Sequence, residues 1–340
     1  MTTLVTGAGG ALGTRVLRLL ADRADLDVVT IESDRRLHRS LGSDRHVDAD
    51  CLVHLTAGDH DTLAERGANA LRVTEQVLAD PAAAQVTHLV LLSSAMVYGA
   101  WPNNPVPLTE EAPLRADVSF GFAHQLAQVE QMVDAWRLAV PGRTVTVLRP
   151  VLTLAADGTS SVVRALAAGI GARLDEEDPP AQFLHFDDLA SAVVLGHDQR
   201  LDGVFNVAPD GWVAGETVRA LAGTPPRIRL PAWLIEPAVD IRWRFQRGPI
   251  PPGLWPFAQH PWLVANDRLK AAGWRPTVTS EQAYVEGTEA RWWTMVTPKR
   301  KQELSLGAMV GVALGMVGVG AMLFRRARAA RAILGGQPPA

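Results

Sequence analysis

Regularly spaced glycines near the amino terminus are the first residues with a clear chemical use. The segment TGAGGALG places Gly7, Gly10 and Gly13 between a short β-run and an amphipathic helical stretch. Glycines in such a turn let backbone N–H groups approach a pyrophosphate at the helix amino terminus, where the helix dipole favours negative charge. The spacing predicts a dinucleotide site. The alternative is that the glycines serve only the packing of helix on strand.

An acidic residue stands at the end of the second β-run, DVVTIE. The carboxylate of Glu32 is placed to accept hydrogen bonds from a ribose 2′-hydroxyl. It favours NAD over NADP because it would repel the extra phosphate, although Arg35 and Arg36 offset part of that repulsion. No His, Cys, Asp or Glu residues in the sequence have metal-ligand spacing, so we expect no metal.

Alternating β-runs and helical patterns must position these residues. The β-runs cover residues 3–6, 27–32, 51–57, 87–94 and 144–150. Helical stretches lie between them, which predicts an α/β fold with a doubly wound, parallel Rossmann-type sheet. We expect an NAD-binding domain at residues 1–150. A smaller substrate-side domain that supplies late sheet strands is expected at residues 151–298.

Composition excludes some partners. The chain has 340 residues and a formal net charge of -3, and its Lys and Arg residues are scattered until the carboxyl-terminal part. This distribution gives no basic patch for nucleic acid. The single cysteine, Cys51, lies in an apolar run and permits no intramolecular disulfide. We expect it to be buried, and the main domain to fold in a reducing cytoplasm.

The carboxyl-terminal part contains an uncharged apolar run. Residues 304–324 would form a helix of about 31 Å, close to the thickness of a bilayer core. A transmembrane helix is expected, with a soluble glycine-rich helix as the alternative. Gly307, Gly311 and Gly315 have the small-residue spacing that favours close helix contacts, and hence a homodimer. Because the amino terminus shows no signal peptide, we expect a single-pass cell-membrane protein with a cytoplasmic main domain. Basic residues flank both ends of the run, so its orientation stays open.

The run LLSSAMVYG at residues 91–99 carries a resemblance to a known family. It resembles the extended short-chain dehydrogenases/reductases, the NAD-dependent epimerase/dehydratase family that includes UDP-glucose 4-epimerases. Other matching segments are HLTA, VLRP, FLHFDDLA and FNVA, at residues 54–57, 147–150, 183–190 and 205–208. In that family a Ser or Thr hydroxyl holds the substrate oxygen, and a tyrosine four residues before a lysine moves the proton. The resemblance places the serine at Ser94.

The tyrosine and the lysine are absent where the resemblance places them. Aligning the segment AQVE puts Phe122 at the tyrosine position and Leu126 at the lysine position. Neither side chain can transfer a proton. A shift of one helical turn pairs Phe120 with His124 and still provides no phenol. Tyr98 is the tyrosine of VYG, which is normally part of the fold.

A second departure concerns the cofactor. The 18 residues between Glu32 and Cys51 leave room for one crossover but not for an additional strand with its own helix. We therefore expect the third strand of the family to be deleted, which removes one wall of the adenine pocket. The resemblance implies NAD as the cofactor and these contacts: Gly7, Gly10, Ala11, Leu12, Gly13, Glu32, Leu55, Ala57 and Asn69.

Two hypotheses of function follow from these departures. The first is a membrane-anchored, catalytically impaired family member, a pseudoenzyme that acts as a ligand-binding protein or scaffold. The second is an active NAD-dependent oxidoreductase or sugar-nucleotide epimerase that uses Ser94 with an atypical acid. The expected partners are a dinucleotide and a nucleotide sugar or lipid-linked small molecule.

Overall fold

The structure is a computed structural model. It describes residues 1–23, 25–31, 49–55, 63–159, 163, 166–167, 179–222 and 252–288. These residues belong to one compact unit, formed by Met1–Ala222 and Pro231–Glu289. The second unit, Gly223–Leu230 with Ala290–Ala340, lies outside the described residues, and so does the expected span at 304–324. Within the described part of the chain, no helix is both long and apolar enough to cross a membrane.

A parallel sheet of six strands forms the centre of the described unit. Its strands are β1 (Thr2–Thr6), β2 (Asp27–Ile31), β3 (Cys51–Leu55), β4 (His88–Leu92), β5 (Thr144–Pro150) and β8 (Gly203–Val207). The order across the sheet is β2-β1-β3-β4-β5-β8, and every neighbouring pair is parallel. The runs CLVHL and HLVLL are buried at every position, as expected for strands covered on both faces. This confirms the expected doubly wound α/β fold.

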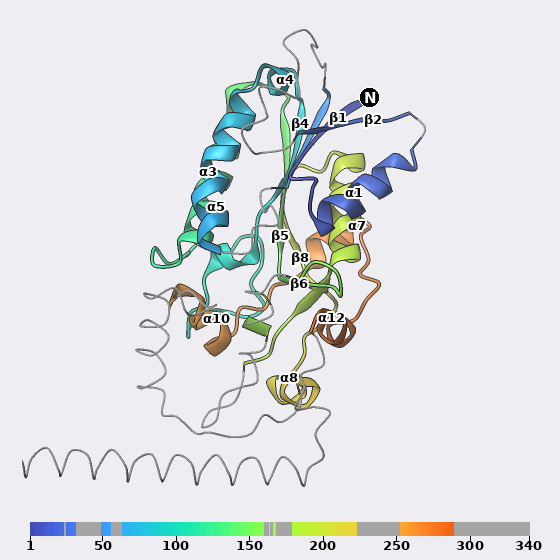
Figure 1. Cartoon of the computed structure of the whole chain (residues 1–340). Coiled ribbons are helices and arrows are strands. Elements are labelled where there is room, and N and C mark those ends of the chain that lie inside the picture. The colour runs from blue at the N-terminus through green and yellow to red at the C-terminus, as the bar shows by residue number, and fades with distance from the viewer. Residues whose placement is uncertain are drawn as a thin grey trace, which may run out of the picture. The chain divides into compact units, whose positions relative to one another are not determined.

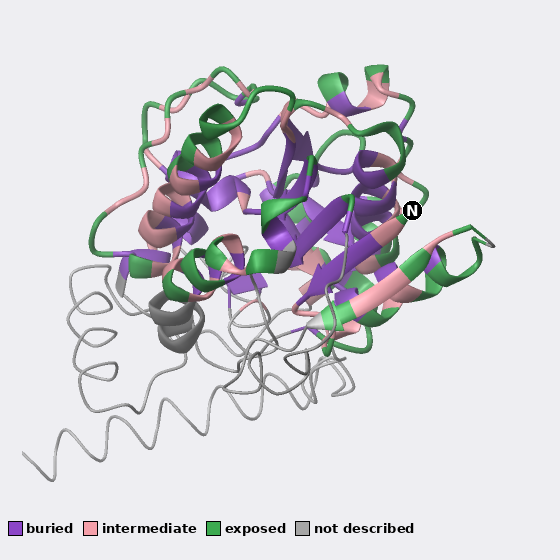
Figure 2. Ribbon diagram, turned by 90° about the horizontal axis from the view of Figure 1, so that it is seen from above, coloured by how far each residue is buried: buried purple, intermediate pink, exposed green. Residues whose placement is uncertain are grey.

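Helices cover both faces of the sheet (Figure 1). One face carries α1 (Ala11–Ala21) and α7 (Phe186–Gln199), and the other carries α3 (Leu63–Ala79) and α5 (Gly121–Ala139). Each layer has its own apolar cluster, so two cores lie on opposite sides of the strands. Figure 2 shows most of the strands as a buried centre within more exposed helices, with the edge strand β2 more exposed than the others. The sheet and its cores therefore fix where the loops at the strand ends lie.

Most of the shorter elements follow β5. A separate two-stranded sheet pairs β6 (Leu152–Leu154) with β7 (Phe183–His185). The remaining elements are α4 (Pro81–Ala84), η1 (Ala95–Tyr98), α8 (Gly215–Ala222), η2 (Pro252–Leu254), α10 (Pro256–Gln259), α11 (Asp267–Ala271) and α12 (Ser280–Gly287). Of these, β6, α8, α10 and α12 gather near the carboxyl edge of the sheet (Figure 1). The expected division into domains at residue 150 stays a prediction. The expected deletion of a strand also stays a prediction, because residues 32–48 are not described.

Two local expectations can be compared with the structure. Cys51 is fully buried in β3, as expected, and this burial raises the pKa of its thiol to about 12. From their place at the start of α7, Asp187 and Asp188 are expected to cap the helix, because carboxylates accept hydrogen bonds from the first backbone amides. Instead the His185 side chain accepts the hydrogen bond from the Asp187 backbone N–H, and both carboxylates bind other elements. They still lie in the first turn, where negative charge complements the helix dipole.

Candidate functional site

A cavity lies at the carboxyl ends of the central strands. It holds about 980 Å³ of space, including the part open to solvent. β1 pairs with β2 on one side and with β3 on the other, so the chain reverses its direction of winding at this point. Open α/β sheets bind ligands at such a switch point. The described residues that line the cavity are Gly7, Gly10, Leu12, Gly13, Leu55, Leu92, Ser93, Ser94, Met96, Phe122, Pro150, Val151, Leu152, Thr153, Gly158, Val163, Leu166, Phe186, Leu189 and Leu254.

The glycine turn forms the edge of the cavity next to β1. Gly7 has φ 71°, and a Cβ there would collide with the carbonyl oxygen of Leu55. A Cβ on Gly13 would collide with the backbone of Ala8. Packing alone therefore requires these two glycines. Helix α1 nevertheless begins with no side-chain cap and no acidic residue in its first turn, which leaves its backbone donors suited to an anion.

Arg15 joins helix α1 to the opposite wall of the cavity. Its guanidinium contacts Asp157 and Asp187, each at 2.5 Å. The hydrogen bond from Arg15 lowers the pKa of the Asp157 carboxyl. Gly158, with φ 118°, lies against the Cβ of Ala11, so Ala11 packs on this loop. These contacts hold the loop after β6 over the first turn of α1.

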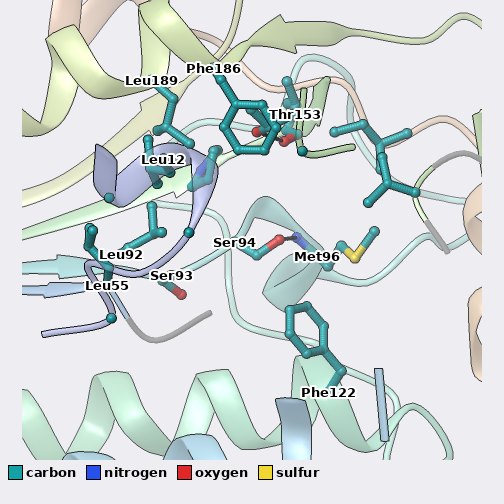
Figure 3. A pocket seen from close by; sticks show the side chains of 18 of the residues that line it. Leu12, Leu55, Leu92, Ser93, Ser94, Met96, Phe122, Thr153, Phe186 and Leu189 are labelled. Carbon is teal, nitrogen blue, oxygen red and sulfur yellow. Dashed lines mark hydrogen bonds between the residues drawn. The ribbon is translucent and has the colours of Figure 1, made fainter. Parts of the chain in front are cut away.

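The positions assigned to catalysis lie together only in part. Ser94 and Phe122 line the same cavity, and Figure 3 shows Phe122 on one side with Phe186 and Leu189 on the other. Leu126 is 2% exposed and lies about one turn after Phe122 in α5. The Oγ of Ser94 accepts a hydrogen bond from the Met96 backbone N–H at 3.2 Å. The aromatic ring of Phe122 thus occupies the wall where the resemblance places a phenol.

A buried polar network lies behind the cavity, and sequence analysis did not identify it. Ser93 donates to Glu130 Oε1 at 2.5 Å. Arg149 pairs with Glu130 at 2.6 Å and donates to the Tyr98 hydroxyl at 2.8 Å. Tyr98 in turn donates to Asn206 Oδ1 at 2.8 Å. These residues belong to sequence motifs: the adjacent serines to LLSS, Glu130 to AQVE and Arg149 to VLRP. Nothing in their spacing along the chain indicated that their side chains form hydrogen bonds with one another.

The other expected site residues are placed as follows. Leu55 lines the cavity, as do Gly10 and Leu12. Asn69 lies on α3, but its side chain is not among those described. Glu32 and Ala57, together with Arg35 and Arg36, lie outside the described residues.

His124 is half-buried on α5. Among the described residues, no group of three or more His, Cys, Asp or Glu side chains could hold a metal ion.

The parallel sheet, the switch point and the glycine turn define a Rossmann-type nucleotide-binding protein. The model of the NAD dependent epimerase/dehydratase family matches residues 3–208. The chain therefore belongs to this family, which confirms the family suggested by its sequence motifs.

Individual proteins provide one comparison by sequence and two by structure, and the two structures share the fold. An uncharacterized protein of Mycobacterium tuberculosis is 27% identical over 172 residues, which cover 49% of this chain and 46% of that protein. The chain thus matches about half the length of this curated relative. Among solved structures, the UDP-glucose 4-epimerase of Thermus thermophilus in complex with NAD is 18% identical, with a TM-score of 0.55 over 85% of this chain and 98% of the other. The human epimerase family protein SDR39U1 with NADPH is 19% identical, with a TM-score of 0.59 over 86% of this chain and 100% of the other.

Proposed function

We propose that this chain is a membrane-anchored, dinucleotide-binding member of the family with an impaired proton-transfer apparatus, and that it acts as a ligand-binding protein or scaffold. The observation that carries the proposal is the pair of apolar side chains at the expected Tyr and Lys positions. Phe122 lines the cavity and Leu126 is buried. A phenyl ring cannot donate a proton, and a leucine cannot lower a pKa or hold a ribose hydroxyl.

The residues at the switch point fit a dinucleotide. The glycine turn allows close approach of a pyrophosphate, and the uncapped first turn of α1 offers backbone N–H donors. Ser94 stands on the same cavity, next to β4. A bound nicotinamide would supply hydride transfer. The residues of this chain would hold and orient it in a largely apolar cavity. Glu32 supports NAD rather than NADP, because its carboxylate would repel the extra phosphate of NADP.

The membrane anchor is proposed from residues 304–324 and their lack of charge. With this anchor the Rossmann unit would stand at the cytoplasmic face of the cell membrane. The spacing of Gly307, Gly311 and Gly315 supports a dimer formed through the anchor.

A second candidate function is an active oxidoreductase or sugar-nucleotide epimerase. Ser94 favours it, because its Oγ accepts from Met96 and its own proton has no acceptor among the described residues. Such a hydroxyl can hold a substrate oxygen. The substrate would be a nucleotide sugar or a lipid-linked small molecule, and the acid would be an atypical one.

Titration of the purified full-length protein with NAD and NADH tests the proposal. We expect saturable binding, measured by calorimetry, without turnover of UDP-glucose or UDP-galactose. The Phe122→Tyr variant, alone and with Leu126→Lys, should bind the cofactor equally well, and the double variant should gain turnover. The single variant is needed because an ammonium at the buried position 126 is costly. Turnover by the unaltered protein that disappears with Ser94→Ala would support the second candidate, and no binding at millimolar cofactor would contradict both.

A further inference from the structure

The hydroxyl of Ser93 has a fixed direction. Both carboxylate oxygens of Glu130 accept hydrogen bonds from Arg149, Oε1 from Nε at 3.1 Å and Oε2 from Nη2 at 2.6 Å. Glu130 is therefore a carboxylate that can only accept. Ser93 must give its single proton to Oε1, from which its Oγ lies at 2.5 Å. Ser93 lines the cavity, and it can therefore only accept a hydrogen bond from a ligand there, through the lone pairs of its Oγ.

Ser94 has the opposite polarity. Its Oγ accepts from the backbone N–H of Met96, and its proton has no recorded acceptor within the described part of the chain. Figure 3 shows both serines between the apolar side chains of the cavity, with the bond from Met96 to Ser94. Two consecutive residues thus offer a ligand one acceptor, Ser93, and one donor, Ser94.

The surroundings of the two hydroxyls carry no net charge. None of the described residues that line the cavity has an ionisable side chain. Behind Ser93, Glu130 and Arg149 are 7% and 5% exposed, and they neutralise each other. The third lining hydroxyl, Thr153, donates to the Val151 carbonyl at 3.0 Å. A charged ligand group here would lose its hydration without gaining a counter-ion.

We infer that this end of the cavity binds an uncharged, mainly apolar ligand that bears a hydroxyl group, and that Ser93 selects for that hydroxyl. An alcohol can donate to Ser93 and accept from Ser94, whereas a ketone can only accept. A carboxylate or a fully ionised phosphate cannot donate, and it would place its charge against the lone pairs of Ser93. The inference rests on the proposed function, since it takes the cavity to be the ligand site.

The inference also distinguishes the two substrate classes left open above. A nucleotide sugar brings a second diphosphate beside that of the cofactor. The first turn of α1, whose backbone donors suit an anion, is assigned to the cofactor, and the described residues that line the cavity offer no cation for another. Arg15, the cation that joins two walls of the cavity, is already held by Asp157 and Asp187. A neutral alcohol of lipid character needs no such partner, so the structure favours the apolar class.

Binding of two matched pairs of probes to the purified full-length protein tests the inference. Cyclohexanol against cyclohexanone measures the value of a hydroxyl, and cyclohexylmethanol against cyclohexanecarboxylate measures the penalty for charge. Calorimetry is performed with and without saturating NADH. We expect the alcohol to bind about fivefold more tightly than the ketone, as one net hydrogen bond would give, and at least about tenfold more tightly than the carboxylate.

Variants separate the role of Ser93 from general effects on the cavity. Ser93→Ala should abolish the preference for the alcohol and leave the affinity for the ketone unchanged, whereas Ser94→Ala should weaken both. Ser119→Ala, at an exposed position, is the matched control and should change neither. Thermal unfolding of each variant verifies that it folds.

The outcomes distinguish this inference from the proposed function. Equal affinity for alcohol, ketone and carboxylate, or an unaltered preference in Ser93→Ala, overturns the inference even if NADH binds. Tighter binding of UDP-glucose than of the alcohols also overturns it. Binding of the alcohol by a protein that does not bind NAD or NADH would sustain the inference and refute the dinucleotide proposal.

Discussion

Individual residues of the glycine turn differ in what a side chain would meet. Gly7 has φ 71° and no room for a Cβ beside the carbonyl of Leu55, whereas a Cβ on Gly9 would have no atom within 4 Å. The two residues lie in the same turn, and only one of them is required by packing. A glycine pattern by itself is therefore weak evidence for a ligand site, because packing alone can require some of its glycines.

Alanine substitution of these two glycines should have unequal effects. Gly7→Ala should lower the free energy of unfolding by at least about 2 kcal/mol, because it combines a left-handed backbone with a backbone collision. Gly9→Ala should change it by less than about 0.5 kcal/mol. Urea unfolding of both variants measures the difference. Equal stabilities would show that the turn is not packed against β3 as described.

Neighbouring carboxylates on α7 connect this helix to two different elements. Asp188 is 1% exposed, and it accepts hydrogen bonds from the Thr277 backbone and hydroxyl and from the Val278 backbone, at 2.7 to 3.0 Å. Asp187 points the other way, to Arg15 of α1, and is 63% exposed. The segment before α12 is thus fastened to α7 by one buried acid.

Asparagine substitutions should reveal this division. Asp188→Asn replaces one acceptor oxygen by an NH₂ group that faces a donor, and it should cost about 2–3 kcal/mol of stability. Asp187→Asn removes an ion pair whose carboxylate is 63% exposed, and it should cost less than about 1 kcal/mol. Denaturant unfolding of the two single variants provides the comparison. A larger loss for Asp187→Asn would contradict the assignment.

The elements themselves could be predicted from sequence, but many of their connections could not. β-runs such as residues 3–6 and 144–150 and the turn after the first run have local patterns, and the structure places strands there. The partners of Asp188 lie about ninety residues further along the chain, and no local pattern indicates them. The direction of the Ser93 hydroxyl depends on Glu130 and Arg149, which meet only after the helix and strand have packed. Sequence motifs therefore predicted several residues that line the cavity, whereas the directions of its hydroxyl groups required the fold.

Across the whole molecule, two buried histidines tie the sheet to the helices on its two faces. His54 of β3 lies between Thr6 of β1, at 2.5 Å, and Thr74 of α3, at 2.9 Å. Thr74 donates to the Ala70 carbonyl, so it accepts from His54 Nε2, and Thr6 donates to Nδ1. His88 of β4 lies 2.8 Å from the Thr144 hydroxyl and 3.1 Å from the Gly196 carbonyl on α7. Both rings satisfy these bonds as neutral imidazoles.

These histidines should make the stability of the whole unit depend on pH. Burial lowers the pKa of His54 to about 4 and that of His88 to about 4, from an ordinary value near 6.5. Below about pH 6.5 the two imidazoles become protonated in the unfolded chain, whereas in the folded chain they stay neutral down to about pH 4. The free energy of unfolding is therefore at its full value above pH 6.5, and it falls as the pH decreases from 6.5 to 4. Each histidine should cost about 1–2 kcal/mol between pH 7 and pH 5. Urea unfolding at a series of pH values measures the slope, and His88→Gln should remove about half of it, because a neutral amide does not titrate. A slope that is unchanged in this variant would mean that the loss of stability in acid arises from other groups.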